Sequence, residues 1–136
     1  MASRNRKIRV LLARFPLEPH SRGMITVAGM LRDAGMEVIL LGNARPQKIV
    51  EVAKQEKADV VGISSYCGGE LALCDELMRV AEKLGIKDST VFILGGVFPP
   101  GDVPRLKELG FSAVFMPSST REEIIAVIKS AVAAKK

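Results

Sequence analysis

The segment Asp59-Val60-Val61-Gly62-Ile63-Ser64 is a nearly continuous apolar run that ends in a serine. A short run of this kind is typical of a strand that is covered on both faces of a parallel sheet. We therefore predict a central strand over these residues. Similar runs occur on both sides of it in the chain, and they predict four further strands over residues 8–14, 37–41, 90–94 and 113–116.

Amphipathic segments separate the predicted strands. The first is predicted as a helix over residues 23–34 that ends at Gly35, because glycine is favoured directly after a helix. Its apolar residues recur near the helical period at Ile25, Ala28, Leu31 and Ala34. Further helices are predicted over residues 45–55, 69–84 and 99–109, and a last one is expected to begin after a cap at Ser119 or Thr120.

This alternation predicts an α/β fold, a flavodoxin-like, doubly wound sheet of five parallel strands with helices on both faces. The expected strand order is 2-1-3-4-5, with right-handed crossovers. The chain has 136 residues, and we expect residues 1–136 to form a single domain. Within it, residues 1–7 are expected to be a flexible basic N-terminus and residues 130–136 a C-terminal tail.

Composition argues against several partners. No apolar run approaches the ~20 residues of a membrane span, and the basic N-terminus is not followed by the apolar core of a signal peptide. We therefore expect a cytoplasmic protein with no membrane partner. The net charge of +5 comes mainly from the two ends of the chain, without clustered basic and aromatic residues in its body, so no nucleic-acid partner is expected. Cys67 and Cys74 lack metal-like spacing and are expected to be reduced thiols.

Residues suited to ligand binding gather after three of the predicted strands. The first loop carries Glu18 and His20, the second begins at Ser64, and the third begins at Gly95 and Gly96. These strands are neighbours in the predicted order, so their loops open onto one crevice at the carboxyl edge of the sheet. Glycine lets a ligand approach the backbone closely, and an imidazole oriented by a carboxylate is a good metal ligand. The pattern predicts a groove with a metal-capable histidine at its mouth.

Other functions of doubly wound folds lack their motifs here. The chain has neither G-x-G-x-x-G after the first strand nor G-x-x-x-x-G-K-[ST], so dinucleotide and P-loop sites are not predicted. A phospho-acceptor receiver needs clustered acidic residues where this chain has Arg14-Phe15 and Ser64-Ser65. The Phe15-Pro16-Leu17 segment does not suit the phosphate loop of a flavodoxin, and the single histidine has no triad partners.

These residues resemble the signature of a known family, the cobalamin-binding domains of methylmalonyl-CoA mutase-type enzymes. The family pattern D-x-H-x-x-G, then S-x-L, then G-G appears here as Glu18-x-His20-x-x-Gly23, Ser64-Ser65-Tyr66 and Gly95-Gly96. The likeness extends from residue 8 to about residue 128. Two departures are Glu18 in place of aspartate and Tyr66 in place of leucine.

The resemblance implies a set of binding residues. His20 would be the lower axial ligand of cobalt, in place of the benzimidazole of the cofactor, and Glu18 would hydrogen-bond its other ring nitrogen. The displaced nucleotide tail would thread between sheet and helices, with Ser64 bonded to the benzimidazole. The full implied cofactor set is Glu18, His20, Ser21, Arg22, Gly23, Ser64, Tyr66, Gly68, Gly95, Gly96 and Ser119.

The resemblance also implies a function. The chain is similar to the small subunit of a two-component, adenosylcobalamin-dependent acyl-CoA mutase, a radical isomerase, with no catalytic side chain of its own. A (β/α)₈ barrel needs ~250 residues, so the barrel-type subunit that binds acyl-CoA is expected to be a separate partner. Two alternatives remain open, namely a corrinoid carrier for methyl transfer and a diverged protein that uses the groove for another ligand or only for docking. The acyl group is not indicated.

Overall fold

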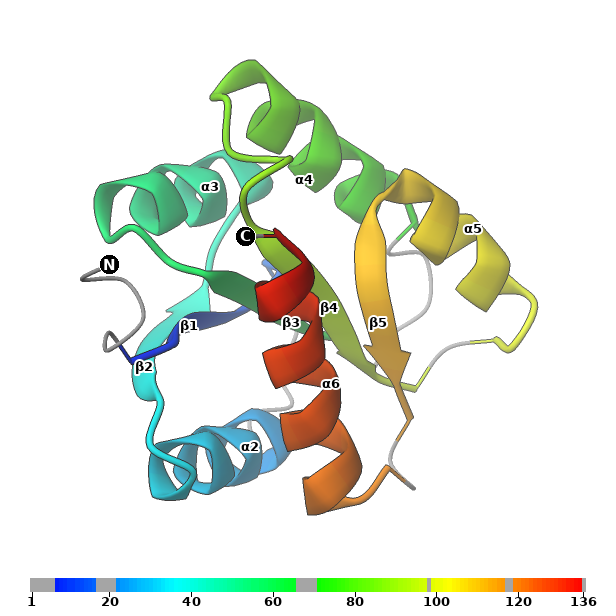
Figure 1. Ribbon diagram of the computed structural model, residues 1–136. Helices are drawn as coiled ribbons and strands as arrows, with labels where there is room; N and C mark the ends of the chain where they lie inside the picture. The colour runs from blue at the N-terminus through cyan, green and yellow to red at the C-terminus, as the bar shows by residue number, and fades with distance from the viewer. Residues whose placement is uncertain (1–6, 17–21, 66–70, 98, 117–118, 136) are drawn as a thin grey trace.

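The computed structural model describes residues 7–16, 22–65, 71–97, 99–116 and 119–135. Its centre is one sheet of parallel strands in the order β2-β1-β3-β4-β5, which confirms the predicted topology (Figure 1). The strands are β1 (Arg9–Arg14), β2 (Glu37–Asn43), β3 (Val60–Ser65), β4 (Val91–Gly96) and β5 (Phe111–Phe115).

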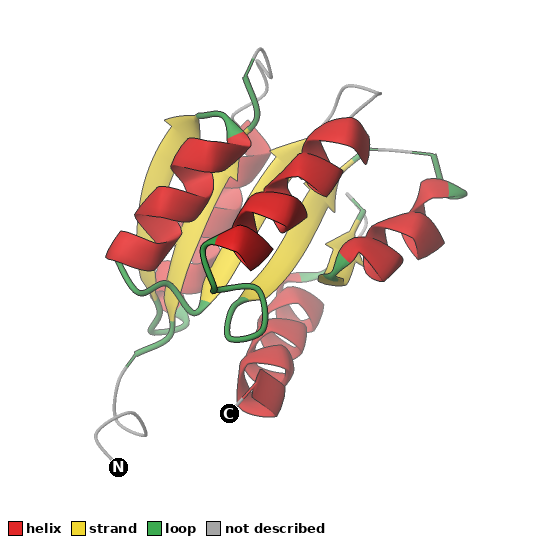
Figure 2. Ribbon diagram, turned by 90° about the horizontal axis from the view of Figure 1, so that it is seen from above, coloured by secondary structure: helices red, strands yellow, loops and turns green. Residues whose placement is uncertain are grey.

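Helices cover both faces of the sheet, as expected (Figures 1 and 2). They are α2 (Arg22–Asp33), α3 (Pro46–Gln55), α4 (Leu71–Lys83), α5 (Asp102–Leu109) and α6 (Arg121–Lys135). Helices α2 and α6 lie on one side, and α3, α4 and α5 pack on the other. None of the helices in the described part of the chain is long and apolar enough to cross a membrane.

Strand β1 shows why the sheet is buried on both sides. Side chains alternate across a strand, and here Val10 and Leu12 belong to the core under α2 and α6, whereas Leu11 and Ala13 belong to the core under α3 and α4. All four are nearly inaccessible to solvent. A continuous apolar run therefore supplies two cores at once, which is the physical content of the sequence pattern.

The structure corrects several expected details. Gly95 and Gly96 lie inside β4 rather than after it, because Ser64 pairs with Gly95 and Ser65 with Gly96 in the β3–β4 ladder. Strand β2 continues to Asn43 through a register shift against β1.

Two expectations about helices also change. Ile25, expected on the apolar face of the first helix, is 58% exposed, and the buried residues of α2 are Met24, Ala28 and Leu31. Residues 130–135, expected as a tail, continue α6, and Val132 is buried there. The expected flexible segment at the N-terminus lies outside the described residues except for Lys7.

The backbone conformation at residue 96 requires a glycine. Its φ of +144° is one that other residues rarely adopt, and a Cβ atom at this position would overlap the carbonyl oxygen of Ser65. The N–H of Val97 donates to the same carbonyl at 3.1 Å, which holds the two strands together at this point. Gly95 differs, because the nearest atom to its Cβ position is the carbonyl oxygen of Phe115 at 3.9 Å.

We expect Gly96→Ala to lower the free energy of unfolding by about 2–4 kcal/mol, since the methyl group forces β3 and β4 apart. Urea denaturation followed by circular dichroism measures the loss. Gly95→Ala is the matched control and should change the free energy of unfolding by less than about 1 kcal/mol. Equal losses for the two variants would contradict this account of the ladder.

Candidate functional site

A groove of about 890 Å³ opens on the face of the sheet that carries α2 and α6. Helix α2 packs on β1 and β2, and helix α6 packs on β4 and β5. The carboxyl half of β3 is therefore left between the two helices, where Gly62 and Ser64 line the groove. On the opposite face, α3 packs against α4 and α4 against α5.

The floor of the groove is made by strand residues, and it combines the small residues Gly62, Ser64 and Gly95 with apolar side chains such as Leu12 and Ile93. Gly95 adds no side chain, so the backbone of β4 is open to a ligand there. At Gly62 the neighbouring strands close the floor instead, since a Cβ at this position would lie 2.7 Å from Cδ2 of Leu12 and 3.3 Å from Cγ1 of Ile93. The missing side chain of Gly62 thus makes room for Leu12 and Ile93. The missing side chain of Gly95 leaves space in the groove for a ligand.

The walls of the groove are largely apolar. Helix α2 contributes Val27 and Met30, helix α6 contributes Ile124, and Phe115 lies at the end of β5. Ligand sites in proteins commonly measure 300–1,000 Å³ and combine such walls with a few polar groups. A flat, apolar ring with a polar edge matches this lining.

Six of the expected binding residues line this one groove, namely Arg22, Gly23, Ser64, Gly95, Gly96 and Ser119. They come from four parts of the chain that are distant in sequence, and the carboxyl ends of the strands bring them together. Gly96 lines the groove, but its backbone conformation is fixed by the Ser65 contact described above. The role of each residue toward a ligand stays a prediction.

The remaining expected residues, Glu18, His20, Ser21, Tyr66 and Gly68, lie outside the described residues. The same is true of Cys67, whereas Cys74 is a buried residue of α4 in the core on the other face of the sheet. Within the described part of the chain, no three histidine, cysteine or acidic side chains come close enough to hold a metal ion together.

Sequence reasoning missed much of the apolar lining of the groove. Val27 and Met30 follow Gly23 at spacings of four and seven residues, which places all three along one side of α2. That spacing was the available signal, but it is also typical of an ordinary core-facing stripe. Arg121 and Ile124 were missed because their position opposite α2 depends on how α6 packs on β4 and β5, which local sequence patterns do not give.

The start of α6 is fixed by a reciprocal cap. The backbone N–H of Thr120 donates to the carboxylate of Glu123 at 3.0 Å, and the N–H of Glu123 donates to the hydroxyl of Thr120 at 3.1 Å. Of the two expected caps, Thr120 is therefore the one used. The N–H of Ser119 donates to the carbonyl of Met116 at 3.0 Å, and this turn sets Ser119 beside the groove. The pKa of Glu123 lies below its usual value, mainly because of the hydrogen bond from the backbone of Thr120. The side-chain hydrogen bond with Thr120 lowers it further.

Thr120→Ala removes the side-chain contribution and leaves the backbone donor, so we expect the pKa of Glu123 to rise but to stay below its usual value. Because the folded-state pKa is lowered, the cap stabilises the protein above the unfolded-state pKa of Glu123 and loses this effect as the pH falls through the folded-state pKa. Carboxyl carbon chemical shifts recorded from pH 2 to 7 measure both states. A pKa of Glu123 that does not move in the variant would contradict the cap.

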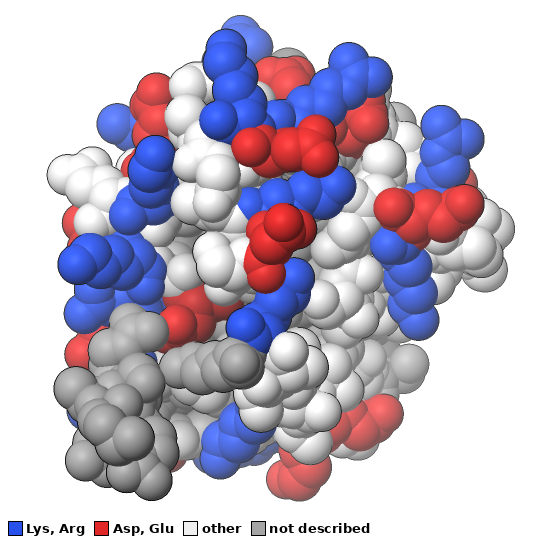
Figure 3. Space-filling model, turned by 45° about the horizontal axis from the view of Figure 1, so that its top comes forward, with Lys and Arg blue, Asp and Glu red and all other residues white. Residues whose placement is uncertain are grey.

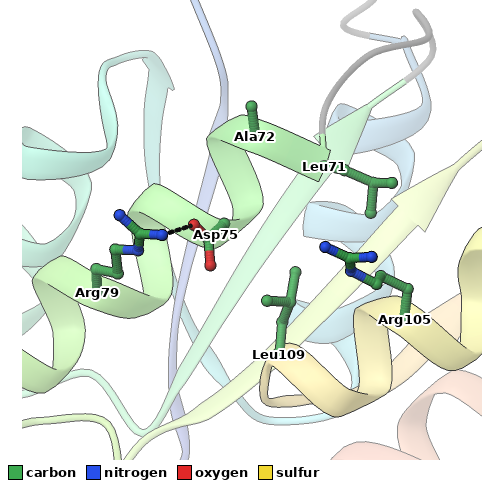
Figure 4. Close-up of a pocket in the computed structure, with 6 residues that line it drawn as sticks. All are labelled: Leu71, Ala72, Asp75, Arg79, Arg105 and Leu109. Carbon is green, nitrogen blue, oxygen red and sulfur yellow. Dashed lines mark ion pairs between the residues drawn. The ribbon is translucent and has the colours of Figure 1, made fainter.

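A second hollow, of about 370 Å³, lies on the opposite side of the sheet between α4 and α5 (Figure 4). Arg79 turns toward Asp75 on its own helix and pairs with it at 2.8 Å, while Arg105 lies near Leu71 and Leu109. The hollow contains no residue of the expected binding set.

Charged side chains of both signs are interspersed over the face shown in Figure 3. No broad surface of one sign is visible in that view.

Comparisons with known proteins give concordant results. The family model described as the B12 binding domain matches residues 8–126. The 2-hydroxyisobutanoyl-CoA mutase small subunit of Aquincola tertiaricarbonis is 40% identical over 129 residues, which cover 94% of each chain. The pivalyl-CoA mutase small subunit of Xanthobacter autotrophicus is 37% identical over 121 residues, 88% of this chain and 80% of that protein.

A longer relative and a solved structure extend these matches. Methylmalonyl-CoA mutase of Escherichia coli is 33% identical over 120 residues, which are 88% of this chain but 17% of that enzyme. A crystal structure of a cobalamin-binding protein from Desulfitobacterium hafniense superposes with a TM-score of 0.79 at 21% identity, over 92% of this chain and 59% of that one. This last likeness shows that the fold is shared.

Proposed function

The chain belongs to the B12-binding domain family, and from this premise we propose that it is the cobalamin-binding small subunit of a two-component, adenosylcobalamin-dependent acyl-CoA mutase. The observation that carries the proposal is the groove between α2 and α6, which opens at the carboxyl edge of the sheet beside Ser64 and Gly95. Family membership alone would not specify such a groove in this chain.

The residues present fit the lower tail of a cobalamin. The open Cβ position of Gly95 leaves room for a flat ring to lie against β4, and Val27, Met30 and Ile124 supply apolar walls for it. The Ser64 hydroxyl is suited to donate to the ring nitrogen of a benzimidazole that no longer binds cobalt. The groove volume of about 890 Å³ is adequate for a nucleotide-sized group.

His20 is proposed as the lower axial ligand. It precedes Arg22 by two residues in the chain, and Arg22 lines the groove, so the sequence position suits a ligand at the rim. Glu18 would accept a hydrogen bond from the second ring nitrogen of His20, which fixes the tautomer and increases the basicity of the ring.

When bound, the cofactor supplies a cobalt–carbon bond that breaks homolytically, which starts a radical rearrangement. The side chains of this subunit would hold the tail, orient the corrin at the edge of the sheet and tune the axial imidazole. None of them is proposed to touch the acyl group. The acyl-CoA site and the shelter for the radical would come from a large, barrel-type partner subunit.

Two observations support a partner of this kind. The relatives that this chain matches along 94% and 80% of their own length are named as small subunits of CoA mutases. Apolar side chains are also exposed near the carboxyl edge of the sheet, with Val97 51% and Ile25 58% accessible. These side chains lie where a corrin-covering partner would dock.

We expect the purified chain to bind adenosylcobalamin with the absorption spectrum of a base-off corrinoid that carries an imidazole ligand. His20→Ala should remove the imidazole signature and weaken binding by at least about tenfold. Ultraviolet–visible titration measures both effects. Nitrogen hyperfine splitting in the paramagnetic cob(II)alamin form, compared between unlabelled and ¹⁵N-histidine-labelled protein, identifies the ligand. Lack of any spectral change with the wild-type chain would refute the proposed function, and an unchanged spectrum in His20→Ala would refute the ligand assignment alone.

We expect Gly95→Val to block the groove while preserving the fold, since the position is open and β-branched residues suit strands. The dissociation constant for adenosylcobalamin should rise at least about tenfold, because the added methyl groups occupy the space of the tail. Gly95→Ala is the graded control and should have a smaller effect. Thermal unfolding of the free proteins checks the fold, and wild-type affinity in Gly95→Val would place the tail elsewhere.

A further inference from the structure

Two arginines lie at the mouth of the groove, and neither has yet been given a specific contact with the cofactor. Arg22 is the first residue of α2, and Arg121 is the first residue of α6. Both line the groove, and they are the charged residues among the described residues that do so. One cationic side chain therefore comes from each wall.

The topology places these two arginines at the same end. Helices α2 and α6 each follow a parallel strand, β1 and β5 respectively, and both start at the carboxyl edge of the sheet. Deeper in the groove the walls and floor become apolar, with Met30 from α2 and Leu12 and Ile93 from the sheet. The groove thus has a cationic mouth and an apolar interior.

Nearby carboxylates do not cancel this charge in the described part of the chain. Arg9 pairs with Glu37 and Arg79 with Asp75, and neither arginine of the groove takes part in these ion pairs. The first turn of α2 contains no acidic residue. The first turn of α6 contains two, but Glu123 is engaged in the cap with Thr120, and Glu122 is adjacent to Arg121 in sequence and so points in another direction.

We propose that Arg22 and Arg121 bind the phosphodiester of the cobalamin nucleotide tail. This inference rests on the proposed function. The tail has a fixed chemical order, in which a phosphodiester with one negative charge lies between the corrin and the apolar benzimidazole. A tail that enters base first places its anion at the rim, where the arginines lie, and its base in the apolar interior.

Arginine suits this role because its planar guanidinium matches two phosphate oxygens at once. Both side chains are exposed in the free chain, so solvent and salt screen each contact until the tail covers it. The arginines are therefore positioning residues that draw in and orient the tail, while His20 and the apolar walls hold the two ends of the ligand.

The test uses the full chain titrated with adenosylcobalamin at low and high salt. Arg22→Met and Arg121→Met should each raise the dissociation constant about fivefold at low salt, and the double variant should raise it further. The wild-type affinity should fall as salt rises, and the double variant should lose most of this salt dependence. A purely structural role would weaken binding but leave the salt dependence in place.

Matched controls are available on the same helices. Arg32→Met in α2 and Lys129→Met in α6 each remove one exposed positive charge away from the groove and should leave the affinity unchanged. Arg22→Lys keeps the charge but loses the planar fork, so it should recover part of the loss. Adenosylcobinamide, which lacks the phosphodiester and the base, should bind the wild type and the double variant with equal affinity.

The results distinguish a failure of the arginine inference from a failure of the proposed function. If the wild type binds adenosylcobalamin and the double variant matches it in affinity and salt dependence, the arginine inference is overturned and the proposed function stands. If the double variant also weakens adenosylcobinamide binding, the arginines act on the corrin or on the fold, and the inference is again overturned. If the wild type does not bind adenosylcobalamin at all, the proposed function fails first.

Discussion

The close approach of β3 and β4 is the constraint on which the rest of this molecule depends. The two strands pair from Val60 with Val91 to Ser65 with Gly96, and the last pair exists only because residue 96 carries no side chain. One pair earlier, Ser64 lies beside Gly95. Successive residues of a strand point to opposite faces of the sheet. Gly96 therefore permits the last pair of the ladder, whereas its neighbour Gly95 leaves space in the groove.

The helices on the two faces of the sheet are arranged differently. Helix α4 contacts both α3 and α5, and side chains of the three helices form a continuous core with Leu11 and Phe92. Helix α2 packs on β1 and β2, helix α6 packs on β4 and β5, and the carboxyl half of β3 lies between the two helices. Stability comes from both faces, and the groove that contains the expected binding residues lies on the divided face.

The polarity of the groove follows from chain direction. In a parallel sheet every helix begins near the carboxyl ends of the strands, so the residues that open α2 and α6 meet at one rim. Arg22 and Arg121 are brought together in this way, although the two positions are ninety-nine apart in number. A ligand that places an anion at the rim of the groove and a flat apolar base in its interior matches this arrangement. The nucleotide tail of a cobalamin has its phosphodiester and its base in this order.

The fold class and the strand order could be predicted from the amino-acid sequence, because buried parallel strands are continuous apolar runs and their carboxyl ends share one edge. The six residues that line the groove were expected as a binding set because the chain resembles a known family, whose signature is carried by Glu18, His20 and Gly23. The three-dimensional arrangement was needed to show that Gly96 serves the backbone, that Gly95 is open, and that Ile25 faces solvent. It alone placed Arg121 and Ile124 opposite α2. Such facts depend on distances between elements that are far apart in the chain, and local propensity and periodicity contain no information about those distances.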